Sequence, residues 1–80
     1  MTDSILLRRL IKQRGLKLKF VAHCLGLSAY GLQMKIDNKS EFKTSEISSL
    51  CELLEISSLR LKEMIFFKEN DDLKSTSKDK

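Results

Sequence analysis

The stretch LKFVAHCLGLSAYGLQMKIDN, residues 18–38, decides how this chain folds. Its apolar spacing predicts two short helices, over 18–25 and 29–36, joined by a tight turn. Ala22, in the middle of the first helix, is small enough for the second helix to approach it closely. Gly26 accepts the left-handed conformation that turns the chain between them. Together these features satisfy the geometry of a helix-turn-helix, with the two helices crossing at a steep angle.

The second of these helices has its own start signal and inward face. Ser28 is a good N-cap, and Leu32 and Ile36 share one face at i,i+4 spacing. Leu27 tucks beneath the turn, and Val21 joins Ala22 on the inward face of the first helix. These apolar residues predict the contact between the two helices.

A further helix precedes this stretch. Asp3 or Ser4 caps it, and Gly15 ends it as the residue after the last turn. Basic residues cover its outer side and concentrate near its carboxyl end, where the helix dipole favours them. Its inward face consists of Ile5, Leu6, Leu7, Leu10 and Ile11.

Two more helices follow a polar turn at 37–40. Phe42 anchors the intervening loop to the core, and Thr44 or Ser45 caps the first of the two helices. Ser57 caps the last one. Their apolar faces are expected to be Ile47, Leu50, Cys51 and Leu54 in the first, and Leu61, Met64 and Ile65 in the second.

These elements predict an all-α, compact five-helix bundle over residues 1–67. Beyond it, residues 68–80 are polar and lack apolar periodicity, so we expect a disordered, flexible tail. No apolar run approaches the ~18–20 residues that cross a bilayer, and the amino-terminal residues lack the features of a signal peptide. We therefore expect a cytoplasmic protein with no membrane partner.

The charge distribution narrows the choice of partner. The chain has a net charge of +4, but residues 1–43 alone carry nine Lys and Arg against three Asp and Glu. Residues 44–80 have a net charge of −2. A basic half joined to a mildly acidic half is typical of a domain that presents one face to a polyanion. A lysine-rich surface that serves solubility alone is the other interpretation.

The chemistry-bearing side chains do not predict an enzyme. Cys24 and Cys51 are both flanked by leucine, and we expect both to fill the core as free thiols. His23 beside Cys24 does not make a metal site, because adjacent helical residues diverge by about 100° and no CxxC or HxxxH spacing completes one. We expect no cofactor, no metal and no small-molecule ligand.

The chain resembles the Cro and phage-repressor type of helix-turn-helix domain, also called the xenobiotic-response-element family. The resemblance extends from Ile5 to Phe67. Its residues are Gly15-Leu16, Val21-Ala22, Leu25-Gly26-Leu27-Ser28, Leu32, Lys35-Ile36-Asp37-Asn38-Lys39, Phe42, Thr44-Ser45-Glu46-Ile47, Leu50-Cys51, Leu54 and Ile56-Ser57. It implies a lambda-repressor-like bundle that binds double-stranded DNA sequence-specifically and regulates transcription by occupying an operator. It also implies a small protein of phage or mobile-element origin, associated with the bacterial nucleoid.

The resemblance further implies which residues contact DNA. The outward positions of the second motif helix, which reach base edges in the family, are Ser28, Ala29, Tyr30, Gln33 and Met34. Gln33 suits adenine and Ala29 suits a thymine methyl group, so the expected site leans toward A·T. The positions expected to contact phosphates are Lys17, Lys19, Lys35, Asn38, Lys39, Ser40 and Lys43. The family commonly starts the first motif helix with Thr-Gln, whereas this chain has Lys17-Leu18.

Three alternatives remain open on the sequence alone. The domain acts either on DNA or as a protein-interaction module, an antirepressor or adaptor that binds another regulator. Gly31 permits close approach either to the DNA backbone or to a neighbouring helix, at a cost of ~1 kcal/mol relative to alanine. The apolar end of the chain's last helix forms either a homodimer seam or part of the monomer core, and its residues are Met64, Ile65, Phe66 and Phe67.

Overall fold

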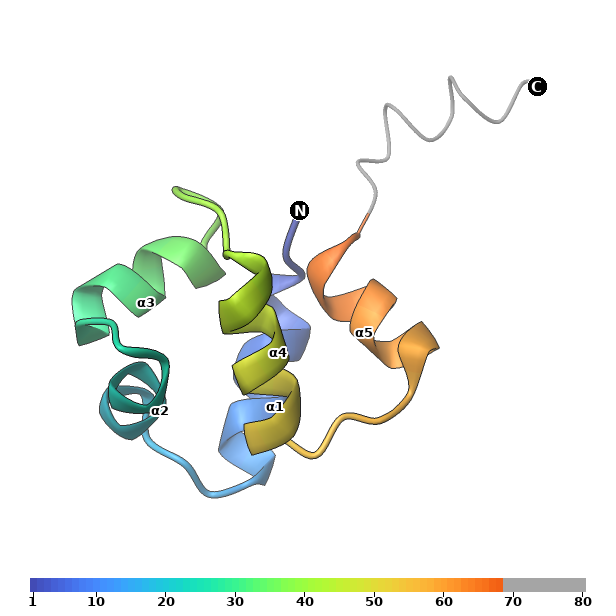
Figure 1. The fold of residues 1–80 in the computed structure, drawn as a ribbon, viewed down its shortest axis with the longest axis horizontal. Helices are drawn as coiled ribbons and strands as arrows, with labels where there is room; N and C mark the ends of the chain where they lie inside the picture. The colour runs from blue at the N-terminus through green and yellow to red at the C-terminus, as the bar shows by residue number, and fades with distance from the viewer. Residues whose placement is uncertain (69–80) are drawn as a thin grey trace.

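The computed structural model describes residues 1–68, which form five helices and no strand (Figure 1). The helices are α1 (Ser4–Gln13), α2 (Leu18–Leu25), α3 (Ala29–Ile36), α4 (Thr44–Leu53) and α5 (Leu59–Phe66). The predicted all-α, five-helix architecture is therefore confirmed. The predicted tail lies outside the described residues, apart from Lys68. No helix among residues 1–68 is long and apolar enough to cross a membrane.

The core lies where all five helices meet. Figure 1 shows α2 and α3 on one side of the bundle and α5 on the other, with α1 and α4 between them. Phe42 contacts the ring of Phe66 edge to face, with 5.7 Å between ring centroids, so it anchors the α3–α4 loop as predicted. The buried apolar side chains come from every helix and the α4 end, namely Leu7, Ile11, Val21, Ala22, Leu32, Ile36, Ile47, Leu50, Cys51, Leu54, Ile65 and Phe66.

Helix starts follow local capping chemistry at α1 and α3. The Asp3 carboxylate accepts from the Leu6 amide at 3.1 Å, and the Ser28 hydroxyl accepts from the Gly31 amide at 2.9 Å. Each bond satisfies one of the amides that a helix start leaves without a partner. These two predicted caps are therefore present.

The caps predicted for α4 and α5 were each misplaced by one or two residues. Helix α4 starts directly after Lys43, whose amide donates to Glu46 Oε1 at 2.8 Å, so no hydroxyl cap is used there. Helix α5 is capped by Ser58 rather than Ser57, since the Ser58 hydroxyl accepts from the Leu61 amide at 3.2 Å. Consecutive Ser and Thr residues offer several equivalent caps, so the sequence does not single one out. In α4 the Glu46 carboxylate, at the third helical position, takes the place of a hydroxyl cap.

Three residues expected in the core lie at the surface. Ile5 is 71% exposed, because it lies on the side of α1 opposite the buried residues of that helix. Cys24 is exposed, because α2 contacts its neighbours through Val21 and Ala22 and the thiol lies off that face. Met64 is half-exposed, because α5 turns Ile65 and Phe66 inward instead. Cys51 is buried as predicted, and burial raises the pKa of its thiol despite the nearby charge of Lys62.

Candidate nucleic-acid interface

Helices α2 and α3 form a closely packed pair joined by a three-residue turn, 26–28. Gly26 has φ +74°, the left-handed conformation expected of it, and the next amide, of Leu27, donates to the Ala22 carbonyl at 2.8 Å. Ala22 is only 1% exposed and Leu32 is fully buried. The pair therefore commits one face of each helix to the core and leaves the outer face of α3 free.

The outer face of α3 contains the residues expected to reach base edges. Ala29, Tyr30, Gln33 and Met34 share one side of the helix by their spacing, and Ser28 lies at its start. Tyr30 is 71% exposed, and Gln33 and Ser28 are also exposed, whereas Ala29 and Met34 are half-buried. The structure thus brings all five residues to one helix and its first turn.

Gly31 makes room for the helix cap rather than for another helix. A Cβ built on Gly31 would lie 3.1 Å from the Ser28 Oγ, and no other heavy atom of a neighbouring element comes within 4 Å. The alternative in which Gly31 admits a neighbouring helix therefore finds no support. The space beside Gly31 belongs to the hydroxyl that caps α3.

Exposed lysines lie before and after the α2–α3 pair. Lys17 and Lys19 stand at the start of α2, and Lys39 and Lys43 lie in the loop between α3 and α4, together with exposed Ser40. Within residues 1–68 none of these four lysines makes an ion pair. Four cations without an ion pair to residues 1–68 are therefore exposed at the start of α2 and in the α3–α4 loop.

Lys35, also expected to contact phosphate, is instead committed within the fold. Its Nζ lies 2.6 Å from Glu46 Oε1, and the two side chains are only 13% and 9% exposed. Burial alone would raise the pKa of Glu46, but the hydrogen bonds from Lys35 and from the Lys43 amide, with the charge of Lys35, outweigh burial and lower that pKa. Lys35 therefore joins α3 to α4, and we leave it out of the phosphate-contacting set.

Asn38 is likewise engaged within the molecule. Its Oδ1 accepts from the Thr2 amide at 2.8 Å and its Nδ2 donates to the Thr2 carbonyl at 2.9 Å. Asn38 has φ +64°, a conformation that asparagine tolerates better than most residues. Its amide group therefore holds the amino-terminal segment, and we also leave it out of the set.

Comparisons with known proteins add no family to this picture. No family model matches the chain, and neither a curated protein nor a solved structure matches it. The relationship to the Cro and phage-repressor family therefore remains a prediction from the quoted residues. The function is inferred below from this chain's own side chains.

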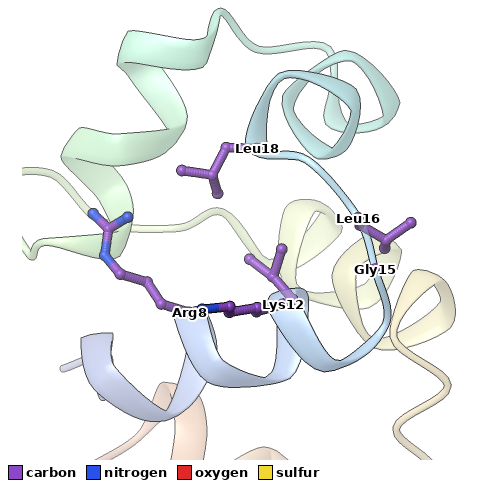
Figure 2. Close-up of a pocket in the computed structure, with 6 residues that line it drawn as sticks. Arg8, Lys12, Gly15, Leu16 and Leu18 are labelled. Atoms are coloured by element: carbon purple, nitrogen blue, oxygen red, sulfur yellow. The ribbon is translucent and has the colours of Figure 1, made fainter.

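A surface feature that the sequence did not predict lies beside the start of α2. A hollow of about 300 Å³ opens between α1 and the residues leading into α2 (Figure 2). The Arg8 guanidinium, at its edge, points from α1 toward α3. That guanidinium pairs with Asp37 at 3.0 Å. A neighbouring hollow of about 630 Å³ is lined by half-exposed Phe20 and by His23. Phe20 lies off the inward Val21–Ala22 face, which was the available signal for its exposure.

Removing the Glu46 carboxylate tests the ion pair between α3 and α4. We expect Glu46→Gln to lower the free energy of unfolding by about 2 kcal/mol at pH 7, because it leaves the Lys35 ammonium partly buried without a counter-charge. Because folding lowers the pKa of Glu46, the stabilisation that its carboxylate gives the wild-type protein is complete above the ordinary pKa of 4.5. This stabilisation is lost as the pH falls through the pKa of the folded state. Urea denaturation of the wild type and the variant at pH 7 and pH 3 measures the loss of stability and its dependence on pH.

Glu52→Gln is the matched control, since Glu52 is exposed on the same helix and makes no ion pair within residues 1–68. It should change stability by less than about 0.5 kcal/mol at either pH. A loss in Glu46→Gln that is equally large at pH 3 would refute the assigned charge interaction.

Proposed function

We propose that this protein binds double-stranded DNA by placing α3 in the major groove, and regulates transcription by occupying its site. The observation that supports this most directly is the outer face of α3. It carries base-compatible side chains, of which Tyr30 and Gln33 are exposed. Four lysines that make no ion pair within residues 1–68 lie at the start of α2 and in the α3–α4 loop. The major groove is wide enough to admit such a helix.

The side chains on α3 indicate a preference for A·T-rich sites. The Gln33 amide matches the paired acceptor and donor of adenine, and the Ala29 methyl matches the thymine methyl group. Tyr30, which is 71% exposed, reaches either a base edge or a phosphate. No arginine or lysine lies on this face to read guanine.

The lysines position the protein without reading sequence. Lys17 and Lys19 contact the backbone from the start of α2, and Lys39 and Lys43 contact it from the α3–α4 loop, with Ser40 as a neutral donor. Each neutralised phosphate releases counterions, so binding weakens as salt rises.

A homodimer would give the domain a larger footprint on DNA. One small module buries ~600–1,000 Å², and two copies on half-sites ~34 Å apart would bind more tightly. Of the four seam residues expected, Ile65 and Phe66 are buried in the monomer core. Met64 and Phe67 are exposed and remain available to a second copy.

Fluorescence anisotropy with a random-sequence duplex tests the proposed function. Four phosphate contacts predict a slope of about −3.6 for log K against log salt, which is a fall of roughly 150-fold in affinity between 50 and 200 mM salt. We expect a Kd of roughly 1–10 µM at the lower concentration. An absence of binding at 50 mM salt would refute the proposal.

A protein-interaction module is the second candidate. The half-exposed Phe20 and the exposed ring of Tyr30 are apolar surface that phosphates do not need. An apolar protein contact responds weakly to ionic strength, in contrast to a DNA complex. Binding that is unchanged between 50 and 200 mM salt would therefore favour this candidate.

A further inference from the structure

The loop that follows α3 is tied to the amino-terminal segment through one side chain. Asn38 accepts a hydrogen bond from the Thr2 amide at 2.8 Å and donates one to the Thr2 carbonyl at 2.9 Å. The side-chain amide thus pairs with both polar groups of one backbone residue, as a neighbouring strand would. Thr2 is only 7% exposed, whereas Asn38 is exposed, so the two bonds are partly buried.

The segment that Asn38 grips is itself held by two other helices. The Asp3 amide donates to the Ile65 carbonyl at 2.6 Å, and the Ser4 hydroxyl donates to the Ile36 carbonyl at 2.5 Å. These bonds connect the segment to the carboxyl ends of α5 and α3. Thr2 is therefore a fixed anchor rather than a loose end.

Asn38 also sets the direction in which the chain leaves α3. Its φ of +64° ends the helix, with the Asn38 amide donating to the Lys35 carbonyl at 3.2 Å and the Lys39 amide donating to the Met34 carbonyl at 2.8 Å. This pattern is a Schellman ending, in which one left-handed residue reverses the chain. The next residues along the chain are Lys39 and Ser40.

We infer that Asn38 is a positioning residue for the DNA-contacting loop: by clamping Thr2 it holds Lys39 where it meets the phosphate backbone. It acts through Lys39 and does not itself donate to DNA. This inference rests on the function proposed above. It assigns the Asn38 amide a task different from the phosphate contact that the sequence suggested.

Glycine substitutions at two matched positions separate the clamp from the backbone conformation. Glu55 ends α4 with φ +58°. It makes the same pair of backbone bonds: its amide donates to the Glu52 carbonyl at 3.1 Å, and the Ile56 amide donates to the Cys51 carbonyl at 2.8 Å. Within residues 1–68 its side chain makes one exposed ion pair, with Arg14. Glycine relieves the left-handed strain at either site. We expect Glu55→Gly to raise Tm by roughly 4–8 °C, and Asn38→Gly to leave it unchanged or lower it.

Amide hydrogen exchange reports on the loop without DNA. In Asn38→Gly we expect exchange at the Lys39 amide to accelerate by roughly tenfold, because the loop opens more often once its anchor is lost. Exchange at Ile56 in Glu55→Gly should not accelerate. Unchanged exchange at Lys39 in Asn38→Gly would overturn the inference.

A double-variant cycle tests whether Asn38 acts through Lys39. Asn38→Gly should weaken binding to the random duplex by roughly threefold or more at 50 mM salt, and Lys39→Ala should weaken it at least as much. In the double variant the loss should equal that of Lys39→Ala alone, because a lysine that is absent needs no positioning. Additive losses, or unchanged affinity in Asn38→Gly, would overturn the inference.

The failure of this inference and that of the proposed function give different results. If the unsubstituted chain binds no DNA at 50 mM salt, the proposed function fails, and the positioning role fails with it. If that chain binds DNA while Asn38→Gly binds equally well, the proposed function stands and only the role of Asn38 is refuted.

Discussion

Replacing Lys39 and Lys43 with alanine is expected to halve the salt dependence of DNA binding. Both lysines are exposed, lie in the loop after α3 and make no ion pair within residues 1–68. Loss of two of four phosphate contacts reduces the slope of log K against log salt from about −3.6 to about −1.8. The fall in affinity between 50 and 200 mM salt then shrinks from roughly 150-fold to roughly 12-fold. Anisotropy titrations at four salt concentrations measure the slope.

The matched control removes the same charge elsewhere. Arg60→Ala combined with Lys62→Ala takes two cations from α5, which lies across the bundle from α3 (Figure 1). We expect this variant to keep a slope within about 0.5 of the wild-type value, since only contacted phosphates release counterions. If both double variants lower the slope equally, the lysines act through net charge, and the assigned face is wrong.

Truncation of Leu32 is expected to have the largest effect on stability. Leu32 is fully buried between α3 and the rest of the core, so Leu32→Ala leaves a cavity where the two motif helices pack. Substitutions of this kind cost about 2–5 kcal/mol. For a domain of this size that lowers Tm by roughly 10 °C or more, which is a large share of its total stability. Thermal unfolding followed by circular dichroism measures the shift.

Leu59→Ala is the control for that measurement. Leu59 is 68% exposed on α5, so its truncation removes little buried apolar surface and leaves no cavity. We expect its Tm to stay within about 2 °C of the wild-type value. Equal shifts in the two variants would show that Leu32 does not occupy the tightly packed site seen in the structure.

Helices α2 and α3 matched their predicted bounds because every local signal agrees there. Gly26 ends one helix and Ser28 starts the next, and the apolar residues on either side of this turn keep helical spacing. The starts of α4 and α5 were less predictable, because several hydroxyl side chains compete at each. The start of α4 is set by the Glu46 carboxylate, which accepts from the Lys43 amide and is held in place by Lys35 of α3.

The exposed face of α3 was also predictable, and for a simple reason. Once Leu32 and Ile36 are identified as the inward face, helical geometry sends Tyr30 and Gln33 outward. The same argument failed for Lys35 and Asn38. Their partners, Glu46 and Thr2, are 11 and 36 residues away, and no local pattern reveals a hydrogen bond across that separation.

Local sequence therefore determined the number of helices, the turn at Gly26 and the side of α3 that faces solvent, since each depends on conformational preference and spacing within a few residues. Tertiary packing alone decided which polar side chains stay free. It placed Lys35 in an ion pair and left Lys39 without one to any residue of 1–68, although the two lysines lie in one short segment. It also buried Phe66 and left Phe67 exposed. Adjacent residues differ in this way because burial depends on which distant helix lies opposite each one.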